Sequence, residues 1–135
     1  MLTKPQADEL WTRLKNMQVA MLATTHENGY VHARPMHHVD QSKDFSGTLY
    51  FFTALDSEKV ADIKREPKVC LSYADHGKED YLCVTGTAYT TQDKALIEQY
   101  WSPMVGGWFN GKDDPNMALL AVEVEHAELW DATSN

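Results

Sequence analysis

The feature that most constrains this sequence is a succession of six short strand-like segments in hairpin order, with only brief helical segments between them. Apolar and polar residues alternate along several of these segments, as expected for strands with one buried face. We expect strands at residues 19–25, 30–39, 48–53, 69–74, 81–89 and 117–125. Consecutive strands with short connections pair antiparallel. The pattern therefore predicts a mainly β protein, a six-stranded antiparallel barrel, rather than a parallel α/β sheet.

Three short helices are expected between or before these strands, and each follows a residue suited to cap it. The expected N-caps are Thr3, Ser57 or Asp56, and Asp93. Residues 103–111 follow the third helix as an irregular, glycine-rich segment that is longer than a simple connection needs.

No linker or repeat divides the 135 residues, so we expect one domain over residues 1–135. Apolar residues make up 43% of the chain, and no stretch reaches the roughly 18 apolar residues of a bilayer span. The first residues lack the apolar centre of a secretion signal, which predicts a cytoplasmic protein. A formal net charge of −8 argues against nucleic acids and anionic membranes as partners.

We interpret the two cysteines and the clustered histidines as residues without a redox or metal-binding role. Cys70 and Cys83 are expected to be buried, reduced thiols, because the CxxC spacing is absent. Of the histidines in the first hairpin, adjacent His37 and His38 point to opposite faces of the strand, so at most His32 and His38 share one. No carboxylate or cysteine completes a ligand set at metal-site spacing, so no metal site is predicted.

A second group of residues has the chemistry of a phosphate site. Arg34 lies among largely apolar strand residues, and its planar guanidinium suits a phosphate. Thr53 offers a hydroxyl at a strand end, and Ser57 and Lys59 lie in the first turn of a helix, where free N–H groups attract anions. The alternative is that Arg34 pairs with one of the twenty acidic residues and Ser57 only caps the helix.

Beyond this group, the chain carries motifs over most of its length. They are Ala20-Met21-Leu22-Ala23-Thr24, His32-Ala33-Arg34-Pro35-Met36, Trp101-x-Pro103, Trp108-Phe109, Gly111, Asp114-Pro115, Leu119-Leu120 and Trp130-Asp131. With these motifs the sequence resembles the pyridoxamine-phosphate-oxidase-like, FMN-binding split-barrel proteins. The motifs from Trp101 to Leu120 are most similar to the bacterial general stress protein branch of this family.

The resemblance implies a split β-barrel that holds FMN, with FAD or riboflavin as alternatives, at the interface of a homodimer. It implies that the cofactor-binding residues are Arg34, Pro35, Met36, Phe52, Thr53, Ser57 and Lys59. It also implies that Trp108 forms a lid that stacks on the flavin ring. The alternative for Trp108 is a plug that packs the end of the barrel.

The chain departs from the oxidases at phosphate-side positions, which sets our functional expectation. It has Val39 and Glu58 where the oxidases carry cations, and it lacks their basic C-terminal segment after Trp130. We therefore expect weak FMN retention and no oxidation of vitamin B6.

The leading hypothesis is an FMN-dependent oxidoreductase on an unidentified small molecule. The alternatives are a non-catalytic flavin-binding, sensing or storage module in stress and an interaction domain that has lost flavin. No catalytic residue is predicted, because flavin chemistry belongs to the cofactor.

Overall fold

The structure is a computed structural model that describes residues 2–131. All six expected strands are present, and every pairing between them is antiparallel. The strands are β1 Val19–Thr25, β2 Val31–His37, β3 Thr48–Ala54, β4 Lys68–Asp75, β5 Asp80–Thr91 and β6 Met117–Trp130. The helices are α1 Lys4–Leu14, α2 Glu58–Arg65, α3 Lys94–Tyr100 and α4 Pro103–Gly106. The chain order of the strands differs from their order in the sheet, which is β2-β1-β4-β5-β6-β3.

The sheet curls so that its two edge strands, β2 and β3, approach each other. The loop after β2 connects the edges: the backbone N–H of Val39 donates to the carbonyl of Tyr50 at 3.0 Å. The buried side-chain amide of Gln41 then donates to the carbonyl of Thr48 and accepts from the N–H of Tyr50, at 2.8 and 3.1 Å. Gln41 thus makes the hydrogen bonds that a neighbouring strand would make with this part of β3. The curled six-stranded antiparallel sheet confirms the predicted split β-barrel.

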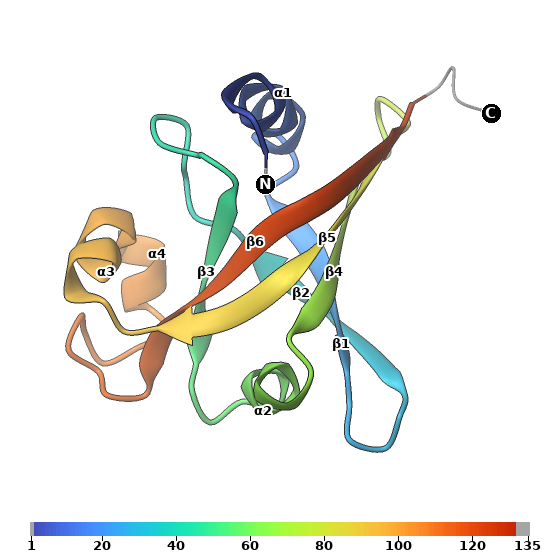
Figure 1. Ribbon diagram of the computed structural model, residues 1–135. Helices are drawn as coiled ribbons and strands as arrows, with labels where there is room; N and C mark the ends of the chain where they lie inside the picture. Colours follow the sequence, from blue (N-terminus) through green and yellow to red (C-terminus); the bar gives the residue numbers. More distant parts are fainter. Residues whose placement is uncertain (1, 132–135) are drawn as a thin grey trace.

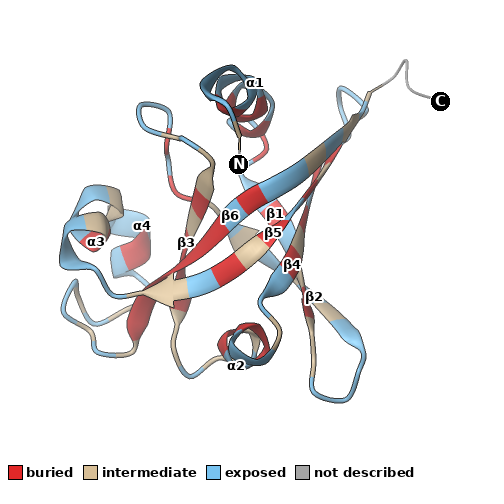
Figure 2. Cartoon of the chain, viewed as in Figure 1, coloured by how far each residue is buried: buried red, intermediate tan, exposed pale blue. Residues whose placement is uncertain are grey.

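The helices cover the curled sheet in different places, with α1 and α2 at opposite ends and α3 and α4 beside β3 (Figure 1). The main core fills the inside and includes Leu14 of α1 and Phe51 of β3. A second, smaller cluster joins β3 and β6 to α3 and α4 through Val39, Phe52, Ile97, Val105, Met117 and Leu119. The start of β6 lies between the two clusters and is therefore buried on both faces, whereas the tip of the β1–β2 hairpin is exposed (Figure 2). No helix within residues 2–131 has the length and apolar character of a membrane span.

Several local predictions are confirmed. Thr3 caps α1 through a capping box, and the Asp93 carboxylate accepts hydrogen bonds from two backbone N–H groups at the start of α3. Pro35 lies in the edge strand β2, where its missing donor removes no ladder hydrogen bond. At Gly86 the β5–β6 register shifts, and a Cβ there would lie 2.1 Å from the carbonyl oxygen of Glu123, so only glycine fits this bulge.

Two local predictions are wrong. Residues 103–111 are not wholly irregular, because they begin with the short helix α4, which has Pro103 in its first turn. The cysteines are half-buried rather than buried, and the Sγ atoms of Cys70 and Cys83 lie 3.1 Å apart on neighbouring strands.

Candidate functional site

The N-terminus of α2 follows β3 after a tight turn, which places Ser57 as the N-cap, as expected. The Ser57 hydroxyl does not cap the helix but donates to the carbonyl oxygen of Ala54 at 2.7 Å. The first N–H groups of α2 consequently have no side-chain acceptor from the cap. An uncapped N-terminus of this kind presents donors and the positive end of the helix dipole to a ligand.

Arg34 extends from β2 toward this helix, with its side chain 22% exposed. One terminal nitrogen, Nη1, donates to the hydroxyl of Thr24 at 2.6 Å and to the carbonyl of Leu22 at 3.3 Å. The other, Nη2, lies 3.7 Å from Oδ2 of Asp62. The alternative that Arg34 pairs with an acid is thus partly realised, although 3.7 Å exceeds the 2.7–2.9 Å typical of a charge-assisted hydrogen bond.

Lys59 lies in the first turn of α2 beside Arg34 and is half-buried. Burial lowers the pKa of its ammonium group, and the charge of Arg34 lowers that pKa further. Within residues 2–131 no carboxylate lies within 4.0 Å of the Lys59 nitrogen. The structure therefore holds two cations together, and one of them has no acidic partner in the described chain.

Phe52 and Thr53 point to opposite faces of β3, because side chains alternate along a strand. Phe52 packs in the cluster under α3 and α4, whereas Thr53 is 3% exposed and its hydroxyl has no hydrogen-bond partner among the described residues. Their side chains cannot both meet a ligand from the same side. A buried hydroxyl without a partner is costly, and such a group calls for an explanation.

Pro35 and Met36 also divide between two faces. Pro35 is exposed on the outer face of β2, opposite Met21 of β1, and Met36 is half-buried against the main core. The predicted alternation along β2 is confirmed, since the residues from His32 to Met36 on Arg34's face are half-buried and the intervening ones are exposed.

Asp62 is the residue that reasoning from the sequence missed. Its carboxylate is 1% exposed and accepts hydrogen bonds from the Thr24 hydroxyl and Nδ1 of His26, both at 2.9 Å. Nitrogen atoms of Arg34 and Arg65 lie 3.7 and 3.9 Å from its oxygens. Burial alone would raise the pKa of Asp62, but these hydrogen bonds and nearby positive charges hold it below its usual value. The sequence offered one signal for Asp62, which is an acidic residue next to the apolar residues of α2.

A cavity of about 790 Å³ lies at the other end of β2, beside α3 and α4. Its size is within the range of small-molecule sites. Aromatic and polar residues share its lining: the rings include Trp11, Phe52, Tyr100, Trp101 and Trp108, and the charged residues include Lys15, Asp40, Lys43 and Asp44. Of the predicted flavin-site residues, Phe52 and Trp108 line this cavity, and Trp108 is 54% exposed.

The cavity wall is held by contacts between the loop after β2 and α3. The Asp44 carboxylate accepts hydrogen bonds from the Tyr100 hydroxyl at 2.9 Å and from the side-chain amide of Gln99. Burial raises the pKa of Tyr100, and the hydrogen bond to Asp44 raises it further. Trp11 also lines the cavity, and its indole N–H is buried without a partner among the described residues.

After Tyr100, His38 is a second titratable group of the cavity with a strongly shifted pKa. Burial and the neighbouring His37 lower it from 6.5 to about 4, and Asp40 opposes this shift. The ring lies 5.4 Å from that of Trp11, and its Nδ1 is 3.3 Å from the Tyr73 hydroxyl. At neutral pH the imidazole is therefore uncharged, so His38 adds no positive charge to the cavity, whose lysines are Lys15 and Lys43.

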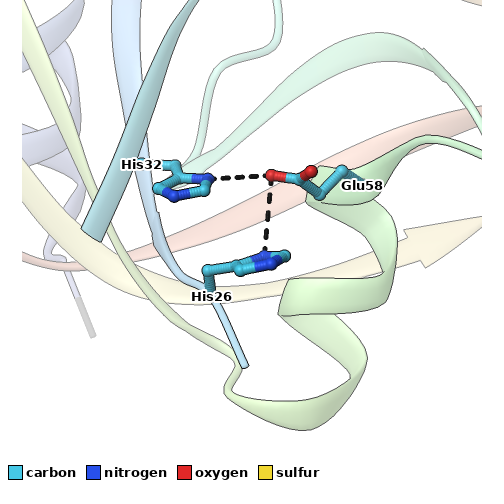
Figure 3. A group of neighbouring side chains, drawn as sticks. All are labelled: His26, His32 and Glu58. Atoms are coloured by element: carbon cyan, nitrogen blue, oxygen red, sulfur yellow. Dashed lines mark hydrogen bonds and ion pairs between the residues drawn. The ribbon is translucent and has the colours of Figure 1, made fainter. Parts of the chain in front are cut away.

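The expectation that no carboxylate joins the histidines of the first hairpin is wrong. His26 and His32 lie together, and Glu58 of α2 reaches both (Figure 3). The spacing argument failed because Glu58 is far away along the chain and meets the hairpin only when α2 packs against β1.

The family model for "Pyridoxamine 5'-phosphate oxidase like" proteins matches residues 5–135. General stress protein 26 of Bacillus subtilis is 33% identical over 122 residues, which span 88% of this chain and 84% of that protein. The crystal structure of the general stress FMN/FAD binding protein from Xanthomonas citri superposes with a TM-score of 0.80 at 31% identity, over 98% of this chain and 93% of that one. A putative general stress family protein from Xanthomonas campestris has a TM-score of 0.79 at 31% identity, over 100% and 93% of the two chains.

Proposed function

This chain belongs to the pyridoxamine 5'-phosphate oxidase-like family, and from that premise we propose that it is an FMN-binding flavoprotein of the general stress protein type. The observation that carries the proposal is Lys59, a half-buried cation with no acidic partner in the described chain, beside Arg34 and at the uncapped start of α2. A phosphate would neutralise this charge and accept from the free N–H groups of the helix. The FMN/FAD binding relative from Xanthomonas citri supports a flavin as the ligand.

Thr53 and Ser57 complete the proposed phosphate end. The unpaired Thr53 hydroxyl would gain a partner from the ligand, which removes the cost of leaving it unsatisfied. The Ser57 hydroxyl is already used by Ala54, so the backbone around Ser57 contributes more than its side chain.

The flavin ring is proposed to extend toward the aromatic cavity. Pro35, Met36 and His37 of β2 separate Arg34 from His38, which directly follows the strand, a span of about 13 Å at the rise of extended chain. A ligand anchored at Arg34 and directed along this edge reaches the wall that Phe52 and Trp108 share. Stacking on Trp108 would hold a planar ring there.

We propose that a second copy of the chain completes this site as a homodimer. The outer face of the β1–β2 hairpin is apolar and exposed, with Val31 at 67% and Met21 at 41% exposure, and Pro35 and Ala33 extend it. Contiguous apolar surface of this kind is typical of a protein interface. Light scattering after size exclusion should give twice the mass of one chain, and Val31→Asp should shift that mass toward the monomer. A monomeric wild-type protein would contradict the homodimer.

The bound flavin would supply hydride and electron transfer, and the chain would supply binding, orientation and a neutral His38 beside the ring end. On this basis the leading function is that of an oxidoreductase acting on an unidentified small molecule.

One observation favours a non-catalytic flavin-binding, sensing or storage module instead. Glu58 adds a negative charge to the first turn of α2, and Asp62 already offsets part of the charge of Arg34. Both weaken the attraction for phosphate, so flavin should exchange readily. Anaerobic mixing of the FMN-loaded protein with NADH or NADPH separates the two functions: reduction at a useful rate supports the enzyme, and a flavin that neither donor reduces supports the module.

The test of flavin binding is a titration with FMN, FAD and riboflavin, which lacks the phosphate. Lys59→Met keeps the aliphatic stem and removes the charge, so FMN binding should weaken by about 10-fold or more while riboflavin binding changes little. Lys64→Met, at the other end of the same helix, is the matched control and should leave both unchanged. Arg34→Ala should likewise weaken FMN binding more than riboflavin binding. An equal loss for both ligands in Lys59→Met would refute the phosphate assignment, and no binding by the wild-type chain would refute the flavoprotein.

A further inference from the structure

A group of possible metal ligands adjoins the proposed phosphate contacts at the first turn of α2 but shares no residue with them. It combines His26, in the turn after β1, with His32 of β2 and Glu58 of α2, and one ligand atom from each lies within 4.8 Å of the others. Oε1 of Glu58 is 2.8 Å from Nδ1 of His32 and 3.6 Å from Nδ1 of His26. The three residues come from different parts of the chain and are held by the packing of α2 on the sheet, so their proximity does not depend on one flexible loop.

The two imidazole rings are arranged so that both serve the same carboxylate. They stack with centroids 4.7 Å apart and planes inclined by 12°. Figure 3 shows both Nδ1 atoms turned toward the same oxygen of Glu58. An imidazole binds a metal ion in the plane of its ring, and these two planes are nearly parallel, so an ion shared by both rings would turn one of them out of the stack.

Two of the permanent positive charges near this group, Arg34 and Arg65, lie beside another carboxylate, that of Asp62, 3.7 and 3.9 Å from its oxygens. Within residues 2–131 Glu58 has no lysine or arginine within 4.0 Å, and its ion-pair partners are the two imidazoles alone. Asp62 accepts at 2.9 Å from Nδ1 of His26, the same atom that faces Glu58, so a second carboxylate adjoins the cluster.

We propose that His26, His32 and Glu58 form a binding site for a divalent transition-metal ion of the zinc class. Tetrahedral zinc with bonds of about 2.0–2.1 Å to nitrogen and oxygen separates its ligand atoms by about 3.4 Å, and the two separations from Glu58 lie on either side of that value. Two histidines and one glutamate form a known three-ligand zinc set that leaves a position for water. Imidazole ligands favour zinc, cobalt or nickel over the hard ions magnesium and calcium.

The solvent exposure of the group fits an ion that enters from water. The side chains of His26, His32 and Glu58 are 20%, 39% and 55% exposed. An ion bound there would displace the protons that the imidazoles share with Glu58 and Asp62. The hydrogen bond from His26 to Asp62 would then be replaced, with Asp62 available as a further oxygen ligand.

The experiment is calorimetric titration of the chelator-treated, flavin-free full chain with zinc chloride. We expect one zinc ion per chain, loss of saturable binding in the His26→Ala and His32→Ala double variant, and weaker binding in Glu58→Gln. The matched control is His126→Ala, which removes the imidazole of another exposed His–Glu pair, His126 with Glu128 at 3.9 Å, and should bind zinc as the wild type does. Cobalt chloride gives an independent signal, because its visible absorption reports the ligand geometry and should vanish in the double variant.

Three results would overturn the metal site: no saturable zinc binding by the wild type, zinc binding unchanged in the double variant, or magnesium binding as tightly as zinc. If the double variant fails to fold by circular dichroism, Glu58→Gln decides, since Glu58 is largely exposed and glutamine keeps its shape. Zinc binding measured in flavin-free protein is independent of the flavin proposal, so either result stands without the other.

Discussion

The two ends of the edge strand β2 differ in the kind of ligand group that their residues could bind. At the α2 end, charged groups crowd together and the buried carboxylate of Asp62 organises Thr24, His26 and Arg34. At the α3 end, aromatic rings such as Phe52, Trp101 and Trp108 share the cavity wall with polar residues, and His38 is neutral at pH 7. The first arrangement suits an anion and the second suits a planar uncharged ring, which is the division of polarity that FMN itself has.

Each end also holds one buried donor without a partner in the described chain. These are the hydroxyl of Thr53 near α2 and the indole N–H of Trp11 at the cavity. Buried donors of this kind are few in folded proteins and are often explained by a missing ligand or water.

The largest expected effect concerns the charged end. Asp62→Ala should lower the free energy of unfolding by about 3–5 kcal/mol, because it leaves Arg34 and the donors of Thr24 and His26 without their buried acceptor. Urea denaturation at pH 7 measures the change. Asp8→Ala, which removes an exposed pair with Lys4, should cost less than about 0.5 kcal/mol. A similar small loss for Asp62→Ala would show that the charged end is not organised around Asp62.

At the aromatic end, His38 predicts a pH dependence of stability. Its pKa in the folded chain, about 4, is below the ordinary 6.5, so the unfolded chain takes up the proton first. The stability from neutral His38 is complete above pH 6.5 and decreases as the pH falls toward 4, by about 3 kcal/mol in all. Urea unfolding of wild type and His38→Gln at pH 7, 5.5 and 4 tests this: the difference between the two should shrink as the pH falls. A difference that does not change with pH would contradict the assignment.

A substitution of Thr53 tests whether its hydroxyl contacts the ligand, because it should raise stability and weaken FMN binding. Thr53→Val replaces an unpaired buried hydroxyl with a methyl group, so the flavin-free protein should gain about 1 kcal/mol of stability and FMN should bind several-fold more weakly. Thr24→Val is the comparison, because the Thr24 hydroxyl is already bonded to Asp62 and Arg34 and its loss should destabilise the chain. Destabilisation by Thr53→Val would indicate a partner for its hydroxyl other than the ligand.

The smallest expected effect belongs to the exposed ring at the cavity. Trp108→Ala should weaken FMN and riboflavin equally, by about 2- to 10-fold, because stacking does not involve the phosphate. Quenching of flavin fluorescence should decrease, and stability should change little, since the side chain is half exposed. Trp130→Ala, an exposed tryptophan at the end of β6, should change neither measurement. Unchanged flavin emission in Trp108→Ala would remove this residue from the site.

Predictions from the sequence were most accurate where a property belongs to a short stretch of chain. The alternation along β2, the caps at Thr3 and Asp93 and the bulge at Gly86 follow from steric and hydrogen-bonding preferences of neighbouring residues. The same reasoning placed Arg34 beside a helix start that carries Lys59, although that placement also drew on a family resemblance.

These preferences of neighbouring residues do not predict contacts between residues that are far apart in the sequence. The meeting of Asp62 with Arg34, and of Glu58 with His26 and His32, depends on how far the sheet curls and on the angle at which α2 packs against it.

The amino-acid pattern by itself thus determined six antiparallel strands and the residue types along each face, because strand periodicity is a local property of the backbone. Only the tertiary structure decided which charges are paired. Coulombic and hydrogen-bonding partners are selected by distances between elements, and these distances arise from packing the whole core at once. Arg34 therefore has a carboxylate beside it, whereas Lys59 has none among the described residues. Two histidines and a glutamate also lie together, although no motif in the sequence predicts that they do.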